Sequence, residues 1–235
     1  MALEDSSLGR LIGVLVSPVK TFRSIAGRRT WGAALLVLLV ASGAVAYVVG
    51  MRTDYRDVIT QSLKAKGRDV PEAQIEPQIN LMQKAGPIIS ACTVPVIIAV
   101  ITLLAALIYW IVFKLLGSDF SFKTSFAVTL HAAMPGVIAA LLTLPVVLSR
   151  STLGYADVKS GTFLQSNLAF LAPADAKAWV TALYASVDFF GLWSIVLTII
   201  GYQAVSRLST KSVAVVVILV SLLFIGVRVG LAALR

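Results

Sequence analysis

The sequence predicts an all-α fold: an integral membrane bundle of five transmembrane helices, preceded by an N-terminal amphipathic helical segment at the membrane interface. Of the 235 residues, 58% are hydrophobic and only 13% are charged. A soluble domain carries about a quarter charged residues, so this chain has too few charges to cover a surface that faces water. Lipid must therefore solvate most of the outside.

Five apolar segments are long enough to cross a bilayer, which takes about 20 mainly apolar residues as a helix. These segments are Trp31 to Gly50, Ile88 to Phe113, Phe126 to Leu148, Val187 to Val205 and Val213 to Leu234. Residues 31–235 are therefore predicted to form the membrane domain, and residues 1–30 a separate N-terminal segment.

The N-terminal segment is amphipathic and basic. Its apolar residues recur at spacings of three and four, as on one face of a helix, and are Leu8, Leu11, Ile12, Leu15, Val19, Phe22 and Ala26. Ser17-Pro18 predicts a break into two short helices, with Ser17 as N-cap and Pro18 at the first helical position. The segment either lies in the headgroup plane or packs against the cytoplasmic end of the bundle. The candidate membrane-surface basic residues are Arg10, Lys20, Arg23, Arg28 and Arg29.

Basic residues near the span ends predict the orientation. The short connections on the N-terminal side add Lys114, Lys123, Arg207 and Lys211 to the five basic residues of the N-terminal segment. We therefore expect a cytoplasmic N-terminus and, because the number of spans is odd, an extracytoplasmic C-terminus. The two long loops, residues 51–87 and 149–186, then face outward. The first is predicted to be helical, with a stripe of Ile75, Ile79 and Met82 after a capping box of Asp69 and Glu72.

The motif search gives no support for an enzyme. The sequence has no Gly-rich phosphate loop, no paired histidines at metal spacing and no Gly-x-Ser-x-Gly elbow. Cys92 is the only cysteine, which excludes a thiolate metal cluster. The net charge of +9 sits mostly beside apolar spans, where it meets lipid headgroups rather than nucleic acid. We expect no catalytic activity, no cofactor, no metal and no nucleic-acid partner.

Ionisable residues inside spans are costly and mark functional hypotheses. His131 lies four residues before Pro135, which removes the helical hydrogen bond to the carbonyl of His131 itself. The imidazole and the free carbonyl form either a small polar site or a locally satisfied kink, and a kink is favoured because no relay partner is visible. With Pro95, which kinks the second span, His131 and Pro135 define the candidate intramembrane polar site.

Asp188 and Arg228 form a candidate ion pair. Asp188 opens the fourth span and Arg228 lies near the end of the fifth, at nearly the same depth when counted from the turn that joins the two spans. The alternative is that each side chain extends separately to the outer interface. A scatter of glycines is predicted to allow close helix packing, and comprises Gly43, Gly136, Gly191, Gly201 and Gly226.

Three stretches carry a family resemblance. They are Ser17-Pro18 with Thr21-Phe22; Phe113-Lys114-Leu115-Leu116-Gly117 with Phe120 to Lys123 and Ala127 to Pro135; and Asp188 to Trp193 with Gly201-Tyr202 and Arg207-Leu208-Ser209. With them the chain resembles the bacterial branch of the Yip family, membrane proteins named for interaction with Ypt/Rab GTPases. The eukaryotic Asp-Leu-Tyr-Gly-Pro signature is absent.

The resemblance implies a non-enzymatic membrane protein in a bacterial inner membrane. We expect an accessory or scaffold subunit that binds other membrane proteins, with subunits of an ATP-driven (ABC-type) transporter as candidate partners. The alternative is a small-solute transporter or channel with a polar cleft near His131. An intramembrane hydrolase would need a second catalytic group that the spans do not supply.

Overall fold

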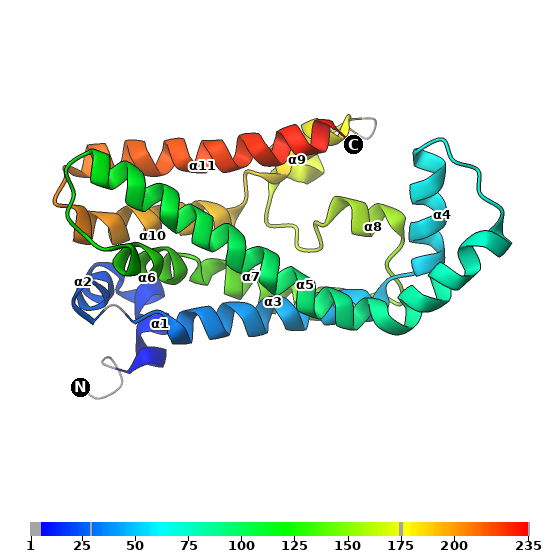
Figure 1. Ribbon diagram of the computed structural model, residues 1–235, viewed down its shortest axis with the longest axis horizontal. Helices are drawn as coiled ribbons and strands as arrows, with labels where there is room; N and C mark the ends of the chain where they lie inside the picture. The colour runs from blue at the N-terminus through cyan, green and yellow to red at the C-terminus, as the bar shows by residue number, and fades with distance from the viewer. Residues whose placement is uncertain (1–5, 29, 174–175, 235) are drawn as a thin grey trace. The chain divides into compact units, whose positions relative to one another are not determined.

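The computed structural model describes residues 6–28, 30–173 and 176–234. Most of these residues are helical, and they form no strand beyond two isolated bridges (Figure 1). Five stretches are long and apolar enough to cross a membrane, when α6 and α7 are taken together. The predicted all-α membrane class is therefore confirmed. The helices are α1 Ser7–Val16, α2 Pro18–Arg28, α3 Gly32–Arg52, α4 Tyr55–Ala65, α5 Glu72–Leu115, α6 Phe122–Ala132, α7 Met134–Leu148, α8 Tyr155–Ser160, η1 Leu168–Leu171, α9 Ala178–Ala185, α10 Phe189–Ser206 and α11 Thr210–Ala233.

The helix of the second span is far longer than the span itself. The predicted span is residues 88–113, whereas α5 is one helix of 44 residues that already begins at Glu72. At 1.5 Å per residue it is about 66 Å long, roughly twice the thickness of a hydrocarbon core. Its prolines, Pro77, Pro87 and Pro95, lie inside the helix without ending it. α5 begins at Glu72, so Glu72 is not the third residue of a helix capped by Asp69, as the predicted capping box requires.

Residues 39–97 and 139–164 form one compact unit, which contains α4 and the first part of α5. Arg56 of α4 forms an ion pair with Glu76 of α5 at 2.8 Å, and Ile75 and Ile79 are buried as the predicted stripe requires. Tyr55 fills the space beside Gly86, where a Cβ atom would overlap its ring. Burial raises the pKa of Tyr55 above its ordinary value, and a hydrogen bond with Ser90 partly offsets this.

The second long loop is tied to the first within this same unit. The backbone N–H of Asp54 donates to the carbonyl of Leu153 at 2.9 Å, and the N–H of Leu153 donates to the carbonyl of Arg52 at 2.7 Å. The N–H of Tyr155 donates to the carboxylate of Asp57 at 2.7 Å. Leu153 is fully buried, so this corner is built by packing as well as by hydrogen bonds.

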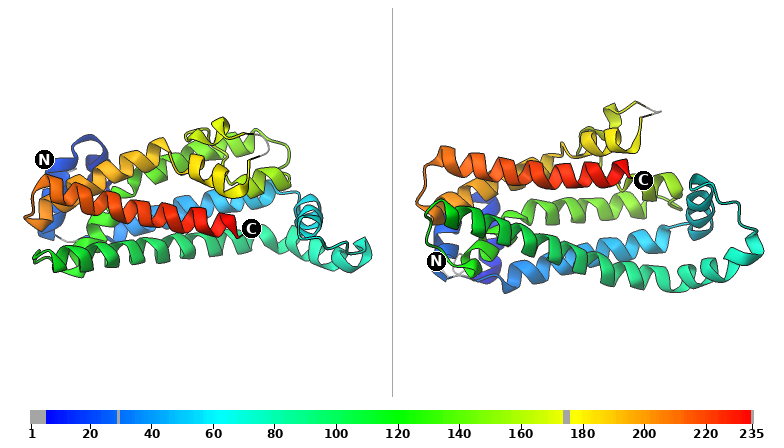
Figure 2. Two further views of the ribbon diagram at one scale, coloured as in Figure 1. Left: turned by 90° about the horizontal axis from the view of Figure 1, so that it is seen from above. Right: turned by 45° about the horizontal axis from the view of Figure 1, so that its top comes forward.

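Residues 1–38, 98–138 and 165–235 form the other compact unit. Here α1 and α2 pack on α6 and α10, and Figure 2 shows them beside the end of α10, where the chain turns into α11. Val14, Phe22 and Ile25 are fully buried by this packing. The break between the two helices falls at Ser17, and Pro18 is the first residue of α2, as predicted.

The N-terminal helices have apolar residues on two faces rather than one. One face is buried against the bundle, but Leu8, Ile12 and Val16 remain 64%, 65% and 73% exposed. The two sequence alternatives therefore describe different faces of the same helices. Packing on the bundle is observed, and a second apolar face remains available to lipid.

Arg10 does not lie on the surface where the sequence placed it. It is only 4% exposed, and its guanidinium donates a hydrogen bond to the hydroxyl of Thr30. Arg10 shares a face with Val14, one turn later, so the packing that buries Val14 also turns Arg10 inward. Lys20, Arg23 and Arg28 are exposed, and Arg29 lies outside the described residues.

Candidate functional site

The third span is interrupted just before Pro135, and this break determines the surroundings of His131. α6 ends at Ala132 and α7 begins at Met134, and the N–H of the intervening Ala133 donates to the carbonyl of Thr129 at 3.1 Å. His131 is 2% exposed, and its Nδ1 lies 2.8 Å from the carbonyl of Ala127, so the ring donates one turn back along its own helix. This hydrogen bond gives the imidazole a partner on its own helix.

The three members of the predicted polar site fall in different parts of the chain. His131 and Pro135 lie together at the break between α6 and α7. Pro95 belongs to the other compact unit, where its ring lies beside Gly43: a Cβ atom added to Gly43 would be 3.3 Å from Pro95 Cγ.

Asp188 has a local role at the start of α10. Its carboxylate accepts a hydrogen bond from the N–H of Gly191 at 2.9 Å as the helix N-cap, and another from the hydroxyl of Ser166. Arg228 is exposed, and within the part of the chain that the structure describes it forms no ion pair with Asp188. Among the described residues, the partners of the Asp188 carboxylate are therefore Gly191 and Ser166, and not Arg228 as predicted.

A buried hydroxyl network joins three spans, and sequence reasoning missed it. Tyr202 of α10 is fully buried, and its hydroxyl lies 2.6 Å from Ser125 Oγ and 2.9 Å from Thr129 Oγ1. The Ser125 hydroxyl donates to the carbonyl of Ala106 in α5 at 2.7 Å, so it accepts its bond from Tyr202. The ring of Tyr202 stacks on Phe113 at 4.8 Å between centroids. The only sequence signal was the set of polar residues within apolar spans.

A second buried hydroxyl, that of Ser118, links the α5–α6 turn to α10 in the same unit. Ser118, in the turn between α5 and α6, is 5% exposed and donates to the carbonyl of Ser206, the last residue of α10, at 2.8 Å. The turn after α10 begins at Arg207, which holds a left-handed backbone conformation with φ of 60°. These contacts fix where α10 ends and where α11 starts.

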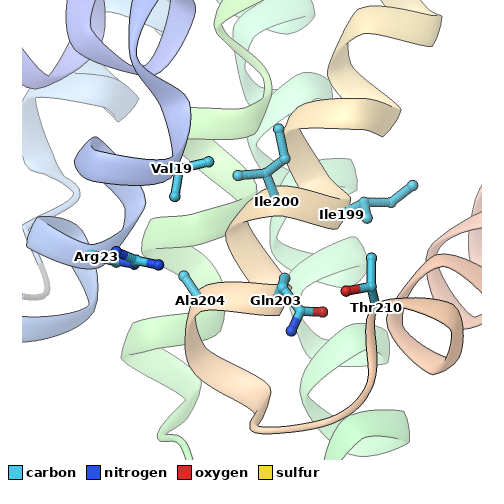
Figure 3. Close-up of a pocket in the computed structure, with 7 residues that line it drawn as sticks. All are labelled: Val19, Arg23, Ile199, Ile200, Gln203, Ala204 and Thr210. Atoms are coloured by element: carbon cyan, nitrogen blue, oxygen red, sulfur yellow. The ribbon is translucent and has the colours of Figure 1, made fainter.

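A pocket of about 300 Å³ opens between α2, the last part of α10 and the start of α11. Figure 3 shows Arg23 extending toward it from α2, and Gln203 beside Thr210 at its other wall. Val19, Ile199, Ile200 and Ala204 complete the lining. Of the residues that line it, the sequence had singled out only Arg23 and Val19, because the pocket depends on how α2 crosses α10.

The pocket contains an acceptor that the protein leaves unsatisfied. Gln203 uses its amide nitrogen to donate to the carbonyl of Leu208 at 3.1 Å. Its amide oxygen is buried and has no hydrogen-bond partner among the described residues. Buried polar atoms are normally hydrogen-bonded, so this oxygen is suited to receive a donor from a ligand or from water.

Comparison with known proteins places the chain in a family. The model of the Yip1 domain matches residues 12–231, which is nearly the whole chain. A curated relative, membrane protein YknW of Bacillus subtilis (strain 168), is 25% identical over 211 residues, covering 86% of this chain and 80% of the relative. No solved structure matches the chain.

Proposed function

Because this chain belongs to the Yip1 domain family, we propose that it is a non-enzymatic membrane protein that binds other membrane proteins as an accessory or scaffold subunit. The proposed partners are subunits of an ATP-driven transporter. The proposed setting is a bacterial inner membrane, with the N-terminus cytoplasmic and the C-terminus extracytoplasmic.

The observation that carries this proposal is the helical projection formed by residues 55–87. α5 continues beyond its predicted span by some four turns, and a spanning helix has no need of this extra length. α4 is fastened to it by Arg56, which pairs with Glu76 at 2.8 Å and approaches Glu72 at 3.8 Å. A segment that is built and braced outside the span is suited to present a fixed surface to a partner.

One face of this projection is free of the internal contacts that brace it. Gln74, Gln78 and Leu81 are spaced by four and three residues, so they share one side of α5. All three are exposed, and Leu81 is 60% exposed. These side chains give the projection an exposed face of two amides and one apolar residue.

The polar groups inside the bundle support the non-enzymatic part of the proposal. The hydroxyl of Tyr202 forms hydrogen bonds with those of Ser125 and Thr129, and the His131 ring forms one with a carbonyl of its own helix. Groups held in this way stabilise the packing of helices.

The test is co-purification from the native host in a mild detergent, followed by quantitative mass spectrometry. We expect transporter subunits to accompany the wild-type chain in fixed ratio, and the double variant Gln74→Arg/Gln78→Arg to lose most of them. Each single variant, Gln74→Arg or Gln78→Arg, is compared with Gln165→Arg, which makes the same single change at an exposed position of the other long loop. Equal recovery of the subunits with the double variant would contradict a role for the projection, and the absence of any stoichiometric membrane partner would contradict the proposed function.

Deletion of residues 1–28 would be a poor test of a partner contact at the N-terminal segment. Phe22 and Ile25 are fully buried against the bundle, so their removal would disturb α6 and α10 as well as any partner contact. Substitutions on the exposed face of α1, such as Leu8→Ser with Ile12→Ser, examine the N-terminal contact without opening the core.

The transporter or channel alternative ranks second. It requires a polar cleft at His131, but that side chain is 2% exposed, is bonded to Ala127 and does not line the pocket at α2. It predicts flux in reconstituted vesicles that falls on His131→Ala, and a flux assay with this variant decides it.

A further inference from the structure

The pocket between α2, α10 and α11 carries the positive charge of Arg23, and no acidic side chain is among the described residues that line it. Arg23 forms no ion pair with any described residue. The elements that build the pocket, residues 6–28 and 189–234, contain no aspartate or glutamate at all. Lys20 and Lys211 each directly follow a lining residue in the sequence, and Arg207 lies between the lining residues Ala204 and Thr210. An anion that binds here therefore meets no competing carboxylate on these elements.

The lining changes from apolar to polar along the direction of α10. Ile199 and Ile200 lie about one turn, or about 5–6 Å, before Gln203, deeper within the span. Gln203, Arg23 and Thr210 lie nearer the end of the helix, where the span meets the membrane surface. Figure 3 shows the apolar side chains of Val19 and Ile200 facing each other across the pocket. A ligand that fits this gradient has an acyl chain at one end and a charged group at the other.

The unsatisfied amide oxygen of Gln203 restricts which headgroups the ligand can carry at its charged end. A phosphate diester carries only acceptors, which suit the Arg23 guanidinium and the Thr210 hydroxyl. The Gln203 amide oxygen instead needs a donor, because it is buried without a partner among the described residues. A headgroup that bears hydroxyls beside its phosphate would satisfy both sides of the pocket.

We propose that this pocket binds one anionic phospholipid with a hydroxylated headgroup, of the phosphatidylglycerol type. Arg23 and Thr210 hold the phosphate, a headgroup hydroxyl donates to the Gln203 amide oxygen, and an acyl chain lies along Val19, Ile199 and Ile200. The bound lipid joins α2 to the α10–α11 pair, so it also holds the N-terminal helices against the bundle. This inference does not depend on whether the chain has a protein partner.

The experiment is native mass spectrometry of the purified full chain in detergent, titrated with phosphatidylglycerol, phosphatidic acid or phosphatidylcholine. We expect phosphatidylglycerol to bind most tightly, with phosphatidic acid weaker and phosphatidylcholine weakest. Attraction of about 1 kcal/mol per basic residue near an anionic lipid corresponds to about fivefold in affinity, and a direct charge-assisted hydrogen bond adds to it. Arg23→Gln should therefore weaken phosphatidylglycerol binding by at least about fivefold.

Two further variants separate the pocket from general surface charge. Arg28→Gln removes the same charge from the same helix outside the pocket lining, and should leave the affinity within about twofold. Ala204→Phe keeps every charge but fills the pocket, and should also weaken binding at least about fivefold, because the acyl chain is displaced. Circular dichroism shows whether each variant keeps its helix content.

Three results would overturn the proposal. Equal losses from Arg23→Gln and Arg28→Gln would mean that the basic surface attracts lipid without a site. Competition by inorganic phosphate at the concentration that suffices for the lipid would mean that the pocket binds a free anion. Binding of phosphatidic acid as tight as that of phosphatidylglycerol would remove the role given to Gln203.

Discussion

Gly201→Ala is the substitution whose effect the structure determines most sharply. A Cβ atom at Gly201 of α10 would lie 2.6 Å from Val128 Cγ1 of α6 and 3.0 Å from Phe22 Cε1 of α2. Optimal separation between carbon atoms is about 3.5–4.0 Å, and both neighbours are fully buried, so neither has room to retreat. Overpacking of this kind costs about 1–3 kcal/mol.

A matched control removes the effect of helix propensity, which favours alanine over glycine by about 1 kcal/mol. Gly226, in the fifth span, has no heavy atom within 4 Å of an added Cβ, so Gly226→Ala gains propensity without a clash. We therefore expect Gly201→Ala to be less stable than Gly226→Ala by about 1–3 kcal/mol, as measured by reversible unfolding in a titration with sodium dodecyl sulfate. Equal stabilities of the two variants would refute the close approach of α2, α6 and α10.

The same clash predicts a compensating substitution. Val128→Ala removes the methyl group that the new Cβ of Gly201→Ala would strike. The double variant should be more stable than the sum of the single effects predicts, with a coupling energy of about 0.5–3 kcal/mol. If the effects of the two substitutions on the free energy of unfolding were strictly additive, the new Cβ atom would not be in contact with Val128, and the helices would have moved apart.

Three further predictions concern hydrogen bonds and burial. Tyr202→Phe keeps the aromatic stack but removes the hydroxyl shared with two α6 side chains, and should cost about 1 kcal/mol in the same titration. Asp57→Ala leaves the N–H of Tyr155 without its acceptor, so residues 151–164 should be cleaved faster in limited proteolysis, by about fivefold for a loss of about 1 kcal/mol. Because burial raises the pKa of Tyr55, its ionisation opposes folding: the associated stability is intact below about pH 10 and is lost as the pH rises through the folded-state pKa. Unfolding measured above about pH 10 should therefore show a steeper decline for the wild type than for Tyr55→Phe.

The sequence predicted the membrane class and the five spans because both depend on composition and on the length of apolar runs. The sequence also predicted a helix in the first long loop, but it missed that this helix continues into the second span as the single helix α5. Residues 72–87 are too polar to count as span, yet Ile75 and Ile79 are buried and Glu76 pairs with Arg56, which keeps the helix continuous outside the apolar stretch. Hydropathy identifies the segment that can lie in lipid. It does not predict where the helix ends, because that depends on the tertiary contacts of its polar part.

The five glycines show the same limit at the level of single residues. The sequence assigned close packing to all of them, but a Cβ would meet side chains or backbone of another helix at Gly43 and Gly201 and nothing within 4 Å at Gly136 and Gly226. At Gly191 the nearest atoms belong to Asp188, the cap of its own helix. Spacing along one helix says which residues share a face, but it does not say which face another helix covers.

Candidate sites were hardest to predict where a polar side chain has two competing uses. Counted along the fourth and fifth spans from the turn that joins them, Asp188 and Arg228 lie at nearly the same depth. The Asp188 carboxylate nevertheless caps the helix that it precedes, because the N–H of Gly191 is only three residues away. His131 likewise bonds the carbonyl of Ala127, one turn back. In a bilayer an unsatisfied polar group costs several kcal/mol, so the partner that is close along the chain meets this need before a distant one can. Gln203 is informative because its local partner, the carbonyl of Leu208, takes only the amide nitrogen and leaves the buried oxygen without a partner among the described residues.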